Sequence, residues 1–337
     1  LQVDGILGGT QTLGAISITG NLDLNNDITN ATSLSVSSTS NLGADVTTTS
    51  TQTYTSGVTL SGGTRTLAAS TVNFVDTLAG GTNGLTITGN LDLDGAATGL
   101  STLEVSGTSN LGADVTTSST QTYSGAVTLS TDVTLTTTNS NVSFGATTDA
   151  GTAGDALVIA AGSGDVTFTG AVGGTTAMGN MTITTGALSA AAMKVQGTID
   201  ITNTNTSSIT GIISDGASSA IVTKAGSGTL TLSGNNTYTG QTNINAGIIS
   251  ITNPNSLGTT AGATIIASGA SLSISNDITS PEDITISGTG ISSNGAIRNT
   301  ANNNTLTGLI TLAADSEIQI DTGSSLTLDP TSGSAIT

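Results

Sequence analysis

Two missing residue types limit the chemistry that this chain can perform. The 337-residue sequence contains no histidine and no cysteine. Serine or cysteine nucleophiles activated by an imidazole therefore cannot form, and neither can zinc sites built from those two residues. Carboxylates remain, and the best group is Asp315, Glu317 and Asp321, which we expect on alternate positions of one strand. Because no tryptophan or basic cluster accompanies them, we predict a solvated strand face, no catalytic residues and no enzyme.

Calcium is the metal that the remaining residues could hold, since hard cations prefer several carboxylate and carbonyl oxygens in a turn. Asp155 and Asp165 stand in glycine-containing turns with the sequences GTAGDAL and GSGDVTF. These two turns are imperfect, whereas calcium-binding β-rolls use tandem repeats of such turns. We therefore expect no cofactor and solvent-facing turn aspartates, with a calcium site at Asp155 and Asp165 as the minor alternative.

The charge of the chain excludes several classes of partner. Twenty-two acidic residues stand against four basic ones, Arg65, Lys194, Lys224 and Arg298, which gives a formal net charge of -18. Nucleic acids and anionic membrane surfaces are bound through clustered Lys and Arg, so we predict neither as a partner. Apolar runs are also far shorter than the ~20 residues of a transmembrane helix, and we predict no membrane insertion by this chain.

One short phrase recurs along the chain: a Thr or Ser, one large apolar residue, a Thr or Ser, and a glycine. Its large residue changes between copies, and five of these residues are Tyr54, Tyr123, Phe168, Tyr238 and Leu306. The glycines of four copies are Gly125, Gly170, Gly240 and Gly308. Because aliphatic residues and Phe replace Tyr in this position, we predict that the side chain fills the core at a corner and binds no ligand.

The first half of the chain contains a long duplication. The sequence GNLDL at residues 20–24 returns at residues 89–93, and NLGADV at residues 41–46 returns at residues 110–115. Tyr54 corresponds to Tyr123 at the same spacing, so the shift between the two copies is constant. We expect this shift to represent three coils of about 23 residues, a common repeat length in solenoids.

The elements that carry these residues are short strands. Two or three apolar residues recur at alternate positions between clusters of Gly, Asn and Thr, which is the pattern of strands with one buried face. No such strand buries its apolar face alone, and repetition over tens of residues indicates a solenoid. We predict an all-β, right-handed parallel β-helix of about 15 coils. A row of β-sandwiches is the alternative, although it needs longer strands and larger core residues.

The sequence suggests three segments of one continuous rod. Residues 1–149 contain the duplication, residues 150–215 look like diverged coils, and residues 216–337 form a second regular run. The chain begins at Leu1 without a Met or a signal-peptide pattern. We therefore expect it to be processed or to be a piece of a longer protein.

The second run resembles a known family. The sequence GSGTLTLSGNNTYTG at residues 226–240, with TNINAG and SLG after it, is similar to the autotransporter-associated β-strand repeat of large bacterial surface proteins. The sequence GTGISSNGAIRN at residues 288–299 resembles the spacer between copies of that repeat. The resemblance implies export to the bacterial surface and a β-helical stalk, and it implies no particular ligand.

These observations predict a non-enzymatic extracellular structural protein that forms a stalk, fibre or matrix at the bacterial cell surface. A solenoid exposes strand edges at its ends, so we also predict head-to-tail assembly into a homopolymeric filament. The alternative is an adhesin passenger that binds a host or neighbouring cell. Such a protein would need loops inserted between coils on one face, and its surface ligand is unknown.

Overall fold

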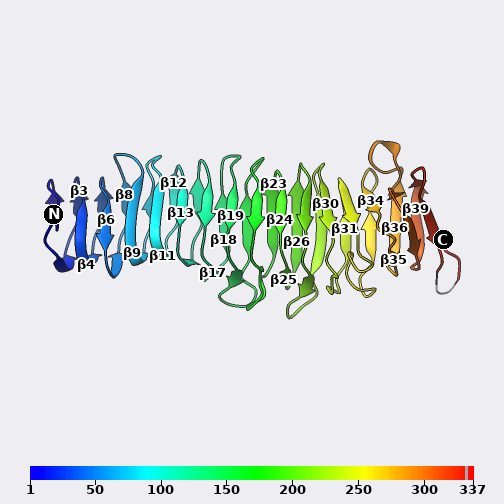
Figure 1. Cartoon of the computed structure of the whole chain (residues 1–337), viewed down its shortest axis with the longest axis horizontal. Coiled ribbons are helices and arrows are strands. Elements are labelled where there is room, and N and C mark those ends of the chain that lie inside the picture. Colours follow the sequence, from blue (N-terminus) through cyan, green and yellow to red (C-terminus); the bar gives the residue numbers. More distant parts are fainter. Residues whose placement is uncertain (331–332) are drawn as a thin grey trace. The chain divides into compact units, whose positions relative to one another are not determined.

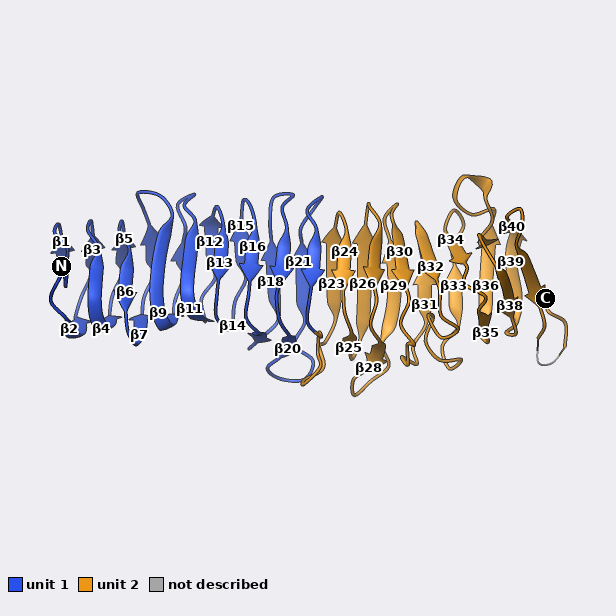
Figure 2. Ribbon diagram, in the orientation of Figure 1, with its two compact units in different colours: residues 1–170 blue, residues 171–337 orange. Residues whose placement is uncertain are grey.

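The computed structural model describes residues 1–330 and 333–337. Nearly every regular element in these residues is a short strand, and paired strands run parallel. The chain divides into two compact units, residues 1–170 and residues 171–337 (Figure 2). Each unit is a β-solenoid, which confirms the predicted all-β parallel fold, whereas the right-handed sense stays a prediction. No helix among the described residues is long and apolar enough to span a membrane.

The alternation of apolar and polar residues sets the inside and the outside of each coil. In β3 (Leu22–Leu24), both leucines are buried and the central Asp23 is partly exposed. The same buried–outward–buried pattern recurs in most three-residue strands of both units. Since alternate side chains of a strand point to opposite faces, a strand this short contributes two residues to the core.

Unit 1 has three sides, and each side is a column of parallel strands. One sheet forms the first side and consists of β1 (Gln2–Val3), β3, β5 (Ser40–Leu42), β8 (Val58–Leu60), β10 (Leu78–Ala79), β12 (Ala97–Leu100), β15 (Val115–Thr117), β18 (Val133–Thr136) and β21 (Leu157–Ala160). The other two sides consist of β2 (Leu13–Ile18), β4 (Ile28–Val36), β6 (Val46–Thr48), β7 (Thr51–Tyr54), β9 (Arg65–Phe74), β11 (Leu85–Leu93), β13 (Leu103–Val105), β14 (Ser109–Leu111), β16 (Gln121–Tyr123), β17 (Val127–Leu129), β19 (Val142–Phe144), β20 (Thr148–Ala150) and β22 (Val166–Phe168).

Long strands bend from the second side to the third. The first half of β11 pairs with β13 and its second half pairs with β14, with a register shift against β9 between Thr88 and Asn90. Where the strands are short, the two columns are separate, as for β6 and β7 beside β9. The corner between these two sides is therefore a bend in continuous strand in some coils and a turn in others.

The coils that the duplication spans in unit 1 are shorter than the sequence predicted. Leu22 pairs with Ser40 and Ser40 with Val58, so residues 22–39 and residues 40–57 are two successive coils. Val58 pairs with Leu78, which ends a third coil, and the next two sides follow at Leu85 and Leu91. The shift of the duplication thus spans three coils and two further sides. The prediction of three whole coils is wrong, because each copy of a strand lies on a different side from its original.

Unit 2 is built from the same kind of coil, with a less regular third side. Its first side consists of β23 (Met181–Thr185), β26 (Thr198–Asn203), β29 (Ile221–Ala225), β31 (Thr242–Ile244), β33 (Thr264–Ile266), β36 (Ile284–Gly288) and β39 (Ile310–Ser316). Its second side consists of β24 (Leu188–Ala190), β27 (Ser207–Ile209), β30 (Thr229–Leu232), β32 (Ile248–Ile251), β34 (Ser271–Ile274), β37 (Ile297–Asn299) and β40 (Ile318–Ile320). The third side consists of β25 (Met193–Val195) with β28 (Ile213–Asp215), and of β35 (Thr279–Ser280), β38 (Asn303–Leu306) and β41 (Ser325–Leu328).

One inserted loop interrupts the regular turns of unit 2. It covers residues 289–296 between β36 and β37 and contains the short 3-10 turn η1 (Ile291–Ser293). Figure 1 shows it as the orange loop that protrudes beside β34 and β36. Coil length in this unit varies accordingly, since the coil that starts at Met181 closes at Ile199, whereas the longer coil that starts at Ile284 closes at Ile310.

Candidate functional site

The large residues of the recurring phrase lie inside the solenoids. Tyr54, Tyr123 and Tyr238 have no exposed surface, and Phe168 and Leu306 are at most 2% exposed. Burial raises the pKa of all three tyrosines far above the usual value of a phenol. Their side chains face the interior and present no group to an external ligand.

Aromatic members of the phrase stack between successive coils of unit 1. The rings of Tyr54 and Phe74 have centroids 5.4 Å apart with 15° between their planes. Tyr123 stacks on Phe144 in the same geometry, and Phe144 stacks on Phe168 at 4.6 Å and 6°. Offset stacking adds about 0.5–1.5 kcal/mol per pair to the burial of the rings. The stack of Tyr54 and Phe74 lies on the third side of the coil, whereas the stack of Tyr123, Phe144 and Phe168 lies on the second side. This difference follows from the shift of the duplication, which places each copy on a different side from its original.

The glycines of the phrase are required by close packing between coils. A Cβ at Gly125 would collide with the backbone of Gly107, and one at Gly240 would collide with the carbonyl of Ala220. Gly170 and Gly308 meet the backbone of the preceding coil in the same way. None of these four has a positive φ, so lack of space, and not backbone conformation, selects glycine there.

A buried glutamine accompanies two of the tyrosines, and the sequence pattern did not single it out. Gln121 donates from Nε2 to the carbonyl oxygens of Val115 and Thr136, at 3.2 and 3.0 Å. Its Oε1 accepts from the hydroxyl of Tyr123 at 3.2 Å. Gln52 makes the equivalent bonds with Tyr54 one repeat earlier. The sequence TQTY occurs at residues 51–54 and again at residues 120–123. This repetition could have revealed the role of the glutamine, because in both copies its side chain satisfies buried backbone carbonyls.

Turn aspartates bond to the next coil. Asp45, Asp114 and Asp132 each accept, through Oδ1, a backbone N–H from the following coil at 2.7–2.9 Å. In unit 2, Asp283 does the same for the N–H of Leu309 at 2.7 Å. Asparagine side chains take the same role at Asn90 and several other corners. These carboxylates therefore replace missing ladder bonds at corners.

Both calcium candidates take part in hydrogen bonds with neighbouring residues. Asp155 accepts the backbone N–H of Thr152 through Oδ2 at 2.7 Å, within its own turn. The backbone N–H of Asp165 donates to Oδ1 of Asn141 on the preceding coil at 2.8 Å. In residues 1–330 and 333–337, no three potential acidic, His or Cys ligands gather closely enough to hold a metal ion.

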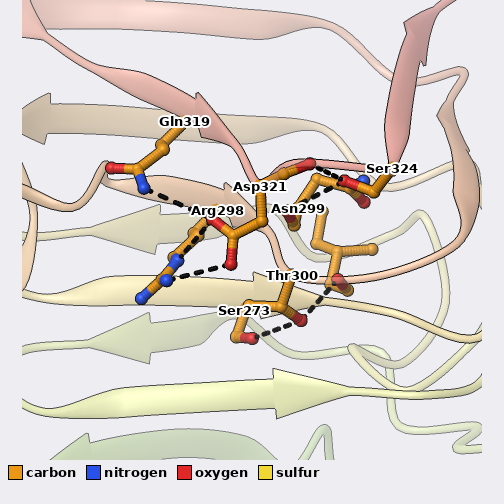
Figure 3. Close-up of polar contacts among 8 residues, drawn as sticks. Ser273, Arg298, Asn299, Thr300, Gln319, Asp321 and Ser324 are labelled. Carbon is orange, nitrogen blue, oxygen red and sulfur yellow. Dashed lines mark hydrogen bonds and ion pairs between the residues drawn. The ribbon is translucent and has the colours of Figure 1, made fainter.

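The three carboxylates near the end of the chain do not share a strand, contrary to our expectation. Asp315 lies in β39, Glu317 lies between strands, and Asp321 follows β40, because the chain turns a corner at Glu317. Asp321 instead forms a bidentate pair with Arg298 on the preceding coil, with Nε–Oδ1 and Nη2–Oδ2 distances of 3.0 and 2.9 Å (Figure 3). Gln319 also donates to Asp321, at 3.3 Å.

Two ionisable side chains lie in the core of unit 2. Lys224 has no exposed surface, and its Nζ donates to the carbonyl oxygens of Ala225 and Gly226 at 2.6 and 2.9 Å. Desolvation lowers the pKa of Lys224 to about 8. Glu282 is 3% exposed and accepts from the hydroxyl of Thr264 at 2.8 Å. Desolvation is the main reason that the pKa of Glu282 is raised to about 8. No pattern in the sequence indicated that either residue points inward.

One hollow on the outer surface of unit 2 lies beneath the inserted loop. It has a volume of about 180 Å³ and is lined by Thr229, Ile248, Ser250, Ser271, Ser273, Ile291, Asn294, Arg298 and Thr300. Most of these residues are the outward positions of β30, β32, β34 and β37, whereas Ile291 and Asn294 belong to the loop. We call this hollow the loop cleft. It gathers hydroxyls, two isoleucines and one arginine, and it contains no nucleophile with a neighbouring base.

Comparison with known proteins gives one match. Residues 222–251, which include most of β29 and all of β30, β31 and β32, match the family described as passenger-associated-transport-repeat. Searches of curated proteins and of solved structures found no match. The matched segment forms regular coils, with the buried Lys224 and Tyr238 inside. A passenger-associated transport repeat within a β-solenoid fits an autotransporter passenger repeat protein, as the resemblance indicated.

Proposed function

We propose that this chain is a non-enzymatic structural protein of the bacterial exterior, which acts as a stalk, fibre or matrix. The observation that carries the proposal is the use of the chemically distinctive residues for packing. The tyrosines, glycines, turn aspartates and Gln121 of the repeats each satisfy a contact between neighbouring coils. The match to a transport repeat of passengers supports a secreted or surface location.

Self-assembly is the finer part of the proposal. In the coil that contains β39 and β40, two residues at inward register positions are exposed: Leu312 to 43% and Ile320 to 49%. Among the described residues, β40 pairs with β37 alone and β41 with β38 alone, so each has an edge without a strand partner. Unpaired edges beside exposed apolar residues favour addition of another strand. A second copy of the chain is the partner that we propose for this edge.

Light scattering of the purified chain over a concentration series tests this assembly. We expect the mean mass to rise with concentration, and we expect Ile320→Lys to hold the chain as a monomer. The matched control is Ile265→Lys, which places the same charge on an outward position of β33 that is 39% exposed. A monodisperse monomer for the unmodified chain, or equal effects of the two variants, would contradict assembly through this edge.

The adhesin alternative has one observation in its favour. The loop at residues 289–296 is an insertion between the first and second sides of one coil of unit 2, and a protruding loop is the kind of feature that a binding passenger needs. Attachment of the purified chain to cells that is abolished by changes in this loop would favour an adhesin. A chain that serves as a stalk alone should not attach to cells in this assay.

A further inference from the structure

The loop over the cleft is held in a defined conformation. Gly290 and Gly295 form a bridge, and the N–H of Gly295 donates to Thr289 at 2.8 Å. Ser271 ties the loop to the sheet, because its Oγ accepts from the N–H of Ile291 at 2.9 Å and donates to the carbonyl of Gly295 at 2.8 Å. The loop is thus bonded to β34 and forms a fixed wall of the cleft.

The backbone of this loop is strained. Ser292 and Ser293 have φ values of 52° and 57°, in the left-handed region that is unfavourable for residues with a Cβ. Gly288, Gly290 and Gly295 also have positive φ. A regular turn would avoid this cost, and strain of this kind is concentrated at functional sites.

The charge of the arginine in the cleft is already neutralised. Asp321 occupies Nε and Nη2 of Arg298, while no hydrogen bond of Nη1 is found within the described part of the chain. The side chain of Arg298 is 37% exposed. The Nη1 group is therefore a positioned donor in a neutral ion pair. Such a donor suits a hydroxyl or carbonyl oxygen better than an anion, which would have to compete with Asp321.

The other lining residues select for an amphipathic ligand. Ile248 and Ile291 supply aliphatic surface, whereas Ser250, Ser273 and Thr300 supply hydroxyls that both donate and accept. The hydroxyls of Ser273 and Thr300 lie 3.4 Å apart, and Thr300 donates to the carbonyl of Ile274 at 3.1 Å. Within the described residues, the hydroxyl of Ser250 and Nη1 of Arg298 have no such partner, and a purely apolar ligand would leave them so at a cost in affinity. A ligand with an apolar face and a rim of hydroxyls satisfies both kinds of surface.

The size of the cleft limits the ligand further. A volume of about 180 Å³ lies below the roughly 300–1,000 Å³ of pockets that hold drug-sized molecules. One six-membered sugar ring fits this limit, and it has an apolar C–H face and hydroxyls at its edge. We propose that the loop cleft binds a single neutral sugar ring at the end of a glycan.

Saturation-transfer-difference NMR of the full chain tests the proposal with a panel of methyl glycosides. The neutral members are those of glucose, galactose, mannose and N-acetylglucosamine, and the charged member is that of glucuronic acid. We expect at least one neutral glycoside to bind with a Kd of about 1 mM, because a single ring buries little surface. Glucuronide should bind no more tightly than the best neutral sugar.

Two variants and one control locate the binding. Ile291→Asp removes apolar surface from the loop without entering the core, and Arg298→Gln removes the Nη1 donor. Each should weaken binding about tenfold or more, equivalent to one decade in Kd. Ile265→Asp, on the first side of unit 2, should leave the signal unchanged. Circular dichroism shows whether each variant keeps its fold, and light scattering shows whether it still assembles. Failure of the stalk proposal can therefore be distinguished from failure of sugar binding.

Three results would overturn the proposal. The first is that no neutral glycoside gives saturation transfer up to about 50 mM, well above the expected Kd. The second is that the folded Ile291→Asp variant binds as tightly as the unmodified chain. The third is that the glucuronide binds more tightly than every neutral glycoside.

Discussion

Replacement of Glu282 by glutamine should remove most of the pH dependence of the stability of unit 2 between about pH 5 and pH 8. Glu282 is buried beside Thr264, whose hydroxyl donates to its Oε1. Its charged and titratable neighbours are Asp283, which also raises the pKa of Glu282, and Tyr238, whose pKa Glu282 raises in turn. Glutamine keeps the acceptor for Thr264 and carries no charge at any pH.

The size of the effect follows from the two pKa values of Glu282. The folded chain holds the proton up to about pH 8, whereas the unfolded chain releases it near the ordinary value of 4.5. The folded state therefore binds more protons between these limits, and stability falls as pH rises by about 1.4 kcal/mol per pH unit. Water entering a loosened coil would reduce the total, so we expect a loss of about 2–3 kcal/mol across the window.

Few other groups titrate in this pH window, and Lys224, whose pKa is about 8, begins to lose its proton only at the upper edge. Without histidine or cysteine, no side chain with an ordinary pKa titrates between about pH 5 and pH 8. Denaturant midpoints should be measured at several pH values, with hydrogen exchange of residues 278–288 to localise the change. Glu104→Gln, an exposed position on β13 in unit 1, serves as the control and should retain the slope. A flat profile for the unmodified chain, or an equal slope in Glu282→Gln, would refute the buried neutral state of Glu282.

Three further predictions concern the contacts between coils. Gly240→Ala should destabilise unit 2 by about 2–4 kcal/mol because its Cβ meets the carbonyl of Ala220, whereas Gly14→Ala, which has open space, should leave the melting temperature unchanged; equal melting of the two variants would contradict the close packing. Gln121→Leu should cost about 2–4 kcal/mol in denaturant unfolding, since it strands two carbonyls and the hydroxyl of Tyr123, and a neutral effect would argue against the corner network. A calcium chelator should leave the melting temperature within about 1 °C, because turn aspartates bond to backbone N–H groups; a large drop would revive the site at Asp155 and Asp165.

The parts of the fold that depend on local alternation could be predicted from the sequence. The inward positions of strands such as β3 and β22 follow from apolar residues two apart, and the burial of Tyr54 and Tyr238 agrees with their exchange for aliphatic residues in other copies. The sequence indicated that Gly125 is required, because a glycine recurs at this position of the phrase. The cause of this requirement, contact with the backbone of Gly107 in the preceding coil, required the structure.

The register of the duplication could not be read from its length. All three sides of a coil accept the same buried–outward–buried strand, so a copy can begin on any side without a change in sequence pattern. Only the pairing of Leu22 with Ser40 shows where a coil closes in that part of the chain. The inward turn of Lys224 in β29 and of Glu282, which lies between β35 and β36, was equally hidden, because charged residues normally face solvent.

The strand register that defines the coil length can be tested with introduced cysteine pairs, because the chain has no cysteine of its own. Asp92 and Asn110 are register partners on β11 and β14, and their side chains bond at 2.8 Å. Parallel neighbours lie within the Cα separation that a disulfide spans. We predict that Asp92→Cys with Asn110→Cys forms an intramolecular disulfide under mild oxidation, measured as loss of free thiols without dimers. Asp92→Cys with Thr116→Cys should stay reduced, because Thr116 lies in β15 on another side of the coil. Oxidation of the second pair instead of the first would indicate the longer coils that the duplication suggested and would contradict the three-sided solenoid described above.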